Sequence, residues 1–270
     1  MHWKRWLTAL VLIPILITII FKGGTIAFTL LTVIVGIIAL WEYFSIAFKN
    51  QPEPVPQFYS FWAYLSGTLL LVAAAFQSWP GIMGALFINL LGVALFSVFH
   101  FKHTDQAPLV MIKQVFGVIY IYFLLGFAIL IHAGPQGPFW LFFVIWVIAW
   151  GDSGALYTGS YFGKHKLCPA VSPKKTIEGA VGGLLANLVF AVLYKMFIFN
   201  ALPISACLFF ALAGGVLGQF GDLFESEFKR AAGVKDSGKL LPGHGGFLDR
   251  IDALLFATPL AYFLKAYLMP

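Results

Sequence analysis

Ionisable side chains are concentrated in one stretch of this chain, residues 221–252. The stretch holds six of the eleven acidic residues and five of the seventeen basic residues. Ionisable groups within or beside a membrane are energetically costly, and they are therefore functional candidates by default. Carboxylates that can hold Mg²⁺, basic side chains and unpaired backbone N–H groups are the components that phosphoryl transfer from a nucleotide requires. The stretch therefore predicts chemistry on a nucleotide phosphate.

Helical spacing would align the polar residues at both ends of this stretch. Four residues at the first end have the spacing i, i+3, i+4 and i+7, which places them on one face of a helix: Asp222, Glu225, Ser226 and Lys229. Asp249 and Asp252, three residues apart at the head of the last apolar segment, would also share a face. Between the two ends, residues 242–246 read Pro-Gly-His-Gly-Gly, which cannot continue a helix. Their backbone N–H groups could approach a phosphate closely.

In residue identity and spacing, this stretch resembles the signature of the phosphatidate cytidylyltransferases, also called CDP-diacylglycerol synthases. The matching residues are Ser226, Lys229, Arg230, Lys235, Asp236, Pro242 to Gly246, Asp249, Arg250 and Asp252. As a strict motif they cover about a tenth of the chain. The length and fixed spacing of the pattern make it far more specific than a short glycine motif.

A second polar cluster lies upstream and extends the resemblance to roughly residues 150–252. It begins with Asp152 in the sequence Trp-Gly-Asp-Ser-Gly-Ala and continues with a basic loop and the sequence Ser-Pro-Lys-Lys-Thr-Ile-Glu-Gly at residues 172–179. The same family carries both elements in this order. Asp152 could instead be a snorkelling or internally paired aspartate, but its small neighbours leave room for a ligand.

Residues 172–178 also have a physical interpretation of their own. Ser172 or Thr176 can cap the helix that follows, and Pro173 suits a first helical turn. Lys174 and Lys175 add positive charge where a helix N-terminus already favours anions. We expect this segment to clamp the phosphates of CTP or the lipid phosphate. The alternative is a basic pair that binds anionic headgroups nonspecifically.

The resemblance implies the reaction CTP + phosphatidic acid → CDP-diacylglycerol + pyrophosphate, with in-line attack of the lipid phosphate on the α-phosphorus of CTP. It implies Mg²⁺ as cofactor, alone or with a second cation. The expected principal metal ligands are Asp222 and Asp249, with Asp252 and Glu225 as auxiliary ligands. The expected catalytic residues are Asp222, Asp249, Lys229 and Arg250. The expected substrate-binding residues are Asp152, Ser172, Lys174, Lys175, Thr176, Glu178, Ser226, Arg230, Lys235, Asp236, His244, Gly245 and Gly246.

Composition predicts an all-α polytopic integral membrane protein. Hydrophobic residues make up 60% of the chain and charged residues only 10%, against about 25% in ordinary soluble domains. Breaks at charged residues, Pro and Gly divide the chain into nine apolar segments of membrane-spanning length. These segments are 5–22, 25–47, 59–78, 82–101, 113–133, 138–160, 179–198, 203–224 and 248–267. The first segment resembles a signal peptide, but no cleavage site follows and we interpret it as a retained helix.

The distribution of basic residues predicts the orientation of these segments. With nine spans, fourteen of the seventeen Lys and Arg residues fall on one side. The positive-inside rule then places the N-terminus and the polar loops in the cytoplasm and the C-terminus outside. We therefore expect a multi-pass protein of the cell (inner) membrane with a cytoplasmic active site. Residues 1–135 would be scaffold helices that could also carry homodimer contacts, and residues 136–270 the catalytic region.

The remaining polar residues offer weaker functional signals. Glu42 stands between Trp41 and Tyr43, and we interpret it as an interfacial residue outside the site. Cys168 and Cys207 suit neither a disulfide nor a metal site. The histidines lack the spacing of zinc ligands. The net charge of +6 does not require a nucleic-acid partner, because the basic residues lie between apolar runs.

Three other functional classes could share this composition. A CTP-dependent lipid or polyprenol kinase is the nearest enzymatic alternative, and it would release CDP rather than pyrophosphate. A secondary transporter would gather its polar residues near the bilayer midplane, whereas here they cluster in loops and at one predicted face. A CDP-alcohol phosphotransferase would need a D-G-x-x-A-R…D-x-x-x-D motif, which the chain lacks.

Overall fold

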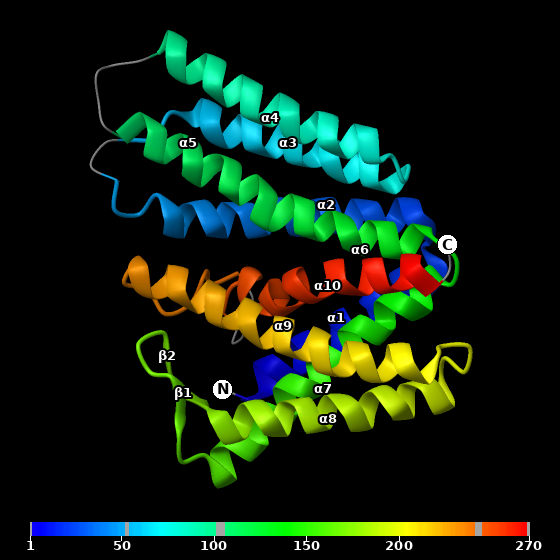
Figure 1. Cartoon of the computed structure of the whole chain (residues 1–270). Coiled ribbons are helices and arrows are strands. Elements are labelled where there is room, and N and C mark those ends of the chain that lie inside the picture. The colour runs from blue at the N-terminus through cyan, green and yellow to red at the C-terminus, as the bar shows by residue number, and fades with distance from the viewer. Residues whose placement is uncertain (1, 52–53, 101–105, 241–244, 269–270) are drawn as a thin grey trace. The chain divides into compact units, whose positions relative to one another are not determined.

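The computed structural model describes the backbone of residues 2–51, 54–100, 106–240 and 245–268, and the side chains at these positions except 2–9, 11 and 106. The described chain is almost entirely helical (Figure 1). The helices are α1 (His2–Lys22), α2 (Gly24–Ala47), α3 (Gln57–Ala75), α4 (Trp79–Phe99), α5 (Gln106–Gly117), η1 (Val118–Phe123), α6 (Leu124–Ala133), α7 (Gly137–Phe162), α8 (Ile177–Phe197), α9 (Ile204–Ala231) and α10 (Leu248–Leu268). The strands are β1 (Lys166–Cys168) and β2 (Ser172–Thr176).

Each of the nine predicted apolar segments coincides with a long helix, once α5, η1 and α6 are taken as one continuous helix. Both predicted breaks inside long apolar runs are confirmed. At the first, Ser78 caps α4 by accepting a hydrogen bond from the N–H of Gly81 at 3.1 Å. Gln77 and Gln136, just before the two new helices, have left-handed backbone φ angles of 53° and 50°. Helix interiors exclude that conformation, so the chain must turn at these residues.

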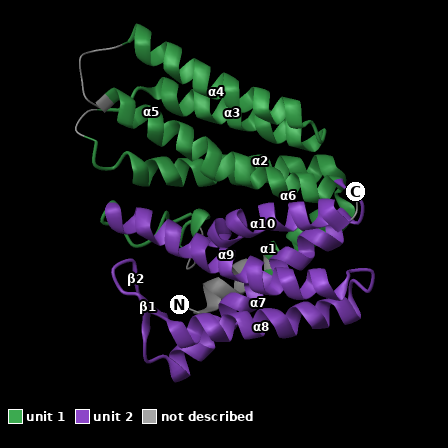
Figure 2. Ribbon diagram, viewed as in Figure 1, with its two compact units in different colours: residues 1–133, 232–249 green, residues 134–231, 250–270 purple. Residues whose placement is uncertain are grey.

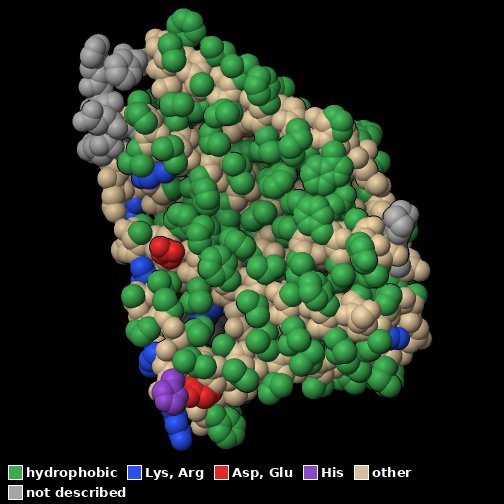
Figure 3. Space-filling view, viewed as in Figure 1, with side chains coloured by type: hydrophobic (Ala, Val, Ile, Leu, Met, Phe, Trp, Pro, Cys, Tyr) green, Lys and Arg blue, Asp and Glu red, His purple; other side chains and the backbone are tan. Residues whose placement is uncertain are grey.

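Eight helices in the described part of the chain are long and apolar enough to cross a membrane. The polytopic, largely helical architecture is thereby confirmed. In α1, the apolar part with described residues is the shorter segment Leu12–Lys22. The count of nine crossings and the orientation of the termini stay predictions. Hydrophobic side chains dominate the face shown in Figure 3, as a lipid-facing surface requires.

The chain forms two compact units (Figure 2). Unit 1 contains residues 1–133 and 232–249, and unit 2 contains residues 134–231 and 250–270. Within unit 1, the α5–η1–α6 helix packs against α2 and α3. Its π-helical turn carries Tyr122, whose ring lies against Gly36 of α2 and Gly67 of α3. A π-turn widens a helix locally, and here its bulky aromatic ring packs where the two facing helices carry no side chain.

Within unit 2, α8 packs along both α7 and α9. Gly151 of α7 and Gly215 of α9 face the amide of Asn187, whose Nδ2 donates to the carbonyl of Ala211 at 3.2 Å. Small residues let membrane helices approach closely, and a buried amide can then hydrogen-bond across them. Helix α9 also packs against α10, where Gly221 lies against the backbone of Asp252. These contacts fix the helix ends that carry the polar residues of unit 2.

A small β-hairpin departs from the all-α prediction. Strands β1 and β2 pair antiparallel, with Lys166 opposite Thr176 and Cys168 opposite Ser172. The prediction that Pro173 occupies a first helical turn is therefore wrong, because it lies in β2. Thr176 is the helix cap: its Oγ1 accepts a hydrogen bond from the N–H of Gly179 at 3.1 Å. The helix thus begins one residue after Thr176.

Candidate active site

The centre of the polar cluster in unit 2 is an ion pair between the hairpin and α9. The Lys175 ammonium lies 2.7 Å from the Asp222 carboxylate, and both side chains are partly exposed. Asp222 Oδ1 also accepts a hydrogen bond from Ser226 Oγ at 3.4 Å. Helix α9 continues to Ala231, two turns beyond the predicted apolar segment, so Asp222 and Ser226 do share a helix face as the spacing predicts.

Two further aspartates belong to the same cluster. The carboxylates of Asp152 on α7 and Asp252 on α10 both interact electrostatically with Asp222. The positive charges of Lys175 and Arg250 both attract the Asp152 carboxylate. Asp252 is only 7% exposed, and its Oδ1 accepts a hydrogen bond from the N–H of Ala253 at 2.8 Å. Three carboxylates from three helices are thus close enough to repel one another.

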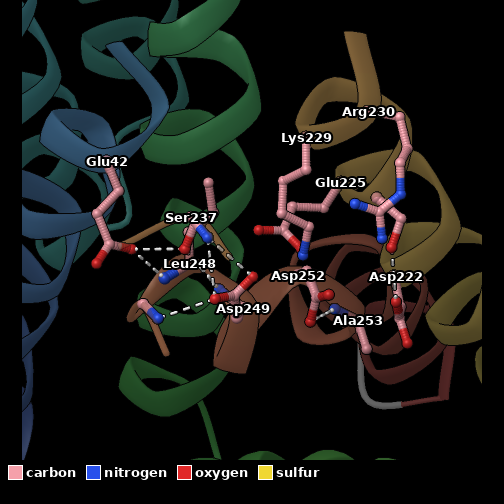
Figure 4. Close-up of polar contacts among 12 residues, drawn as sticks. Glu42, Asp222, Glu225, Lys229, Arg230, Ser237, Leu248, Asp249, Asp252 and Ala253 are labelled. Atoms are coloured by element: carbon pink, nitrogen blue, oxygen red, sulfur yellow. Dashed lines mark hydrogen bonds and ion pairs between the residues drawn. The ribbon is translucent and has the colours of Figure 1, made fainter. Parts of the chain in front are cut away.

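Glu225 and Lys229 form a buried ion pair one turn further along α9. Glu225 is 1% and Lys229 is 7% exposed, so both charges are removed from solvent. Figure 4 shows the Lys229 ammonium pointing toward Asp252, on which its charge also acts. Lys229 therefore links the Glu225 carboxylate to the aspartate cluster. A buried pair of this kind is strongly destabilised when one partner is removed.

The basic hairpin is tied to the helices at both ends. Arg230 Nε donates to the carbonyl of Val171 in the turn at 3.1 Å. At the base of the hairpin, Glu178 accepts hydrogen bonds from His165 Nδ1 at 2.6 Å and from the backbone N–H of Lys164 at 3.1 Å. Glu178, predicted to bind substrate, thus has a described role in holding the hairpin. These contacts place Lys175 beside Asp222, whereas the side chain of Lys174 is exposed.

The polar residues of unit 1 form a separate set around the first turn of α10. Asp249 accepts hydrogen bonds from the backbone N–H of Gly246 at 2.8 Å and of Ser237 at 3.1 Å. Gly245 has a left-handed φ of 82° and lies beside Asp249 and Asp236. Lys235 and Asp236 are exposed. His244 lies outside the described residues.

Sequence reasoning missed two members of the unit 1 set. Glu42, interpreted above as an interfacial residue, is 0% exposed and accepts hydrogen bonds from Ser237 Oγ and from the backbone N–H of Leu248 (Figure 4). The interfacial interpretation is therefore wrong. The available signal was the carboxylate itself, because an ionisable residue inside an apolar helix needs a partner. No pattern near Ser237 or Glu42 names the other as that partner.

Comparison with known proteins decides the family. The model of the "Cytidylyltransferase family" matches residues 3–268. The chain belongs to the cytidylyltransferase family. The resemblance first seen in residues 150–252 therefore extends over nearly the whole chain, including the N-terminal helices that carry Glu42.

Several curated relatives share this similarity along most of their length. A phosphatidate cytidylyltransferase of Bacillus subtilis is 35% identical over 254 residues, which cover 90% of both chains. The protein of the same name from Haemophilus influenzae is 34% identical over an alignment 276 positions long, which covers 95% of this chain and 96% of the relative. That from Staphylococcus saprophyticus is 33% identical, with the same coverage.

The carboxylates of the unit 2 cluster suit a magnesium ion. In the described part of the chain, no three His, Cys, Asp or Glu side chains lie close enough to form a complete metal site. Mg²⁺ does not need one, because it is usually bound by one or two carboxylates together with substrate phosphates and water. Asp222 and Asp252, whose negative charges act on each other, provide two such carboxylates.

Proposed function

We propose that this chain transfers CMP from CTP to phosphatidic acid, which forms CDP-diacylglycerol and releases pyrophosphate. The single observation that carries the proposal is the cluster of Asp152, Lys175, Asp222 and Asp252 in unit 2. It combines carboxylates with a lysine that a phosphate could engage. Membership of the cytidylyltransferase family and the printed name of the relatives support the same reaction.

The chemistry needs positioning and charge compensation rather than a strong base. An oxygen of the lipid phosphate is already anionic, and it attacks the α-phosphorus of CTP as the bond to the β-phosphate oxygen breaks. The two substrates are polyanions that must be held close together in line. Lys175 and Arg250 supply fixed positive charge for this purpose, and the positive charge of Lys229 also acts on Asp252. Fixed cations of this kind also stabilise the charge that develops on the departing pyrophosphate.

Asp222 and Asp252 would hold Mg²⁺, and the bound ion would neutralise charge on the phosphates of CTP. Asp249, predicted from the sequence as a principal ligand, and Glu225, predicted as an auxiliary ligand, stay predictions. Asp249 already accepts two backbone N–H groups, but an ionised carboxylate has about four acceptor positions and so retains capacity for a cation. Asp152 is exposed beside this cluster, where it can contact the metal or the cytidine. A second cation and the contact of His244 with phosphate also stay predictions.

The excess of Lys and Arg on one predicted side supports a cytoplasmic active site. CTP would enter from the cytoplasm, and the diacyl substrate from the membrane leaflet. The proposal also assigns a scaffold role to residues 1–135 and the catalytic role to residues 136–270. A homodimer through the N-terminal helices stays a prediction, which the molecular mass of the purified protein in detergent would test.

The decisive experiment supplies purified protein in detergent with phosphatidic acid, Mg²⁺ and each of CTP, ATP, GTP and UTP. We expect pyrophosphate release and lipid-linked cytidine with CTP, and loss of both in Asp222→Asn. Glu227→Gln, an acid-to-amide change at an exposed position of α9, should keep the activity. CDP release with a newly phosphorylated lipid would instead identify a kinase. No turnover with any nucleotide would contradict the enzymatic proposal, and uptake into vesicles would then be measured.

A further inference from the structure

Glu42 presents a physical problem that its sequence neighbours do not solve. It lies in α2, a helix of membrane-spanning composition, and it is 0% exposed. A buried carboxylate in such surroundings is unfavourable unless hydrogen-bond donors or cations compensate it. Helix α2 carries no Lys or Arg. The compensation must therefore come from another segment of the chain.

That segment is the loop before α10. Glu42 accepts hydrogen bonds from Ser237 Oγ at 3.0 Å, from the N–H of Phe247 at 3.0 Å and from the N–H of Leu248 at 2.8 Å. Leu248 is the first residue of α10. The first N–H groups of a helix lack partners inside the helix, and negative charge is favourable there. Glu42 is thus an N-terminal cap for α10, supplied from 206 residues away in sequence.

Two glycines bring the loop backbone against this carboxylate. A Cβ atom added to Gly238 would lie 2.2 Å from Glu42 Oε1, and one added to Gly246 would lie 2.6 Å from Glu42 Oε2. The Gly246 Cβ would also lie 1.9 Å from Ser237 Oγ. A side chain at either position would displace the Glu42 carboxylate or its partners. The loop is therefore shaped to surround Glu42 rather than merely to pass near it.

Ser237 connects Glu42 to Asp249 at the start of α10. Its hydroxyl donates to Glu42, while its backbone N–H donates to Asp249 at 3.1 Å. The N–H of Asp249 in turn approaches Ser237 Oγ at 3.4 Å. Asp249 is followed directly by Arg250 and, one helical turn later, by Asp252. Contacts that hold the first turn of α10 in place therefore also fix the backbone positions of these three residues.

We propose that Glu42 is a positioning residue for catalysis: through Ser237 and the first turn of α10, it sets the orientation of Asp249 and Arg250. The proposal rests on the function proposed above and extends it to a residue of the second predicted transmembrane helix. The three groups that Glu42 contacts here are all hydrogen-bond donors, so the position requires hydrogen-bond acceptors. An amide would direct its own N–H groups at one or more of them.

The test uses Glu42→Gln, Ser237→Ala and the double variant in full-length protein, with Glu227→Gln as matched acid-to-amide control. We expect Glu42→Gln to lower kcat about 10- to 100-fold, as removal of groups that orient metal ligands commonly does. The Mg²⁺ concentration for half-maximal activity should rise, while KM for phosphatidic acid stays within about twofold. The double variant should lose no more than Glu42→Gln alone, because both residues act through one chain of contacts.

Hydrogen–deuterium exchange supplies a readout that does not depend on activity. Glu42→Gln should accelerate exchange in the segment from Gly245 to Asp252 and leave helices α7, α8 and α9 unchanged. If Glu42→Gln does not fold, Ser237→Ala must show the same accelerated exchange and the same rise in Mg²⁺ requirement. Wild-type exchange and Mg²⁺ dependence in both variants would overturn the proposal, as would independent, multiplicative losses in the double variant. Failure of the wild type and Glu227→Gln to make CDP-diacylglycerol would instead reject the proposed function.

Discussion

Lys175 of the hairpin and Asp222 of α9 form an ion pair of 2.7 Å, with 27% and 36% of their side chains exposed. Such half-exposed pairs contribute only about 0–1 kcal/mol to stability. The ion pair therefore contributes little to the fold, and the function proposed above gives both side chains a role in binding the nucleotide and its metal. In that proposal, Lys175 would contact a phosphate of CTP and Asp222 would contact the metal.

Replacement of Lys175 should lower the activity while leaving the thermal stability unchanged. We expect Lys175→Ala to lower kcat/KM for CTP about 10- to 100-fold, the loss of one charge-assisted contact, with a melting temperature close to that of the wild type. Lys166→Ala, an exposed lysine of β1, is the control and should be silent in both assays. A large fall in melting temperature with unchanged kcat/KM would show that Lys175 serves the fold alone.

Asp252→Asn should lower the activity without lowering the melting temperature. Asp252 is only 7% exposed, and the like charges of Asp222 and Asp152 act on it. Removal of the charge should therefore leave the melting temperature unchanged or raise it, a common result at functional sites. Activity should fall more than about 100-fold at saturating Mg²⁺, because a proposed metal ligand is lost. Thermal unfolding and pyrophosphate release, measured on one preparation, test both parts. Destabilisation with retained turnover would contradict the assignment.

The helices were predictable from the sequence because their causes are local. Long uncharged runs give each membrane segment, and Pro80 with its neighbours interrupts one of them. The shared face of Asp222 and Ser226 follows from helical geometry alone. These features need no knowledge of what packs against them.

The features that the sequence did not reveal depend on distant partners. Glu42 and Ser237 are 195 residues apart, and neither has a neighbour that marks the pairing. Strand β2 contains a proline and two lysines, which are poor strand formers. The hairpin is instead stabilised by contacts outside it, from Arg230 to Val171 and from Glu178 to His165. Local propensity could not have predicted either arrangement.

Thr176→Ala should reveal how much the N-terminal cap of α8 contributes to the stability of the protein. Loss of the hydrogen bond from the N–H of Gly179 to Oγ1 should cost about 1 kcal/mol, or roughly 2–4 °C in melting temperature for a chain of this size. Thr176→Ser keeps the hydroxyl and is the matched control. If Thr176 also binds substrate, as the sequence predicts, KM for CTP will rise in Thr176→Ala beyond what the lost stability explains. Equal behaviour of the two variants would exclude both roles for the hydroxyl.

In the buried pair of Glu225 and Lys229, removal of one charge should destabilise the protein more than removal of both charges. Glu225→Gln leaves the Lys229 ammonium buried without the carboxylate it contacts, and breaking such pairs typically costs about 3–5 kcal/mol. The double variant Glu225→Gln/Lys229→Met removes both charges at similar volume, so it should be more stable than Glu225→Gln alone. Its activity should nevertheless stay low, because the charge that balances Asp252 is gone. Thermal unfolding of the two variants and pyrophosphate release measure these effects separately. Full activity in the stable double variant would show that Lys229 acts only in the fold, and would remove it from the proposed catalytic residues.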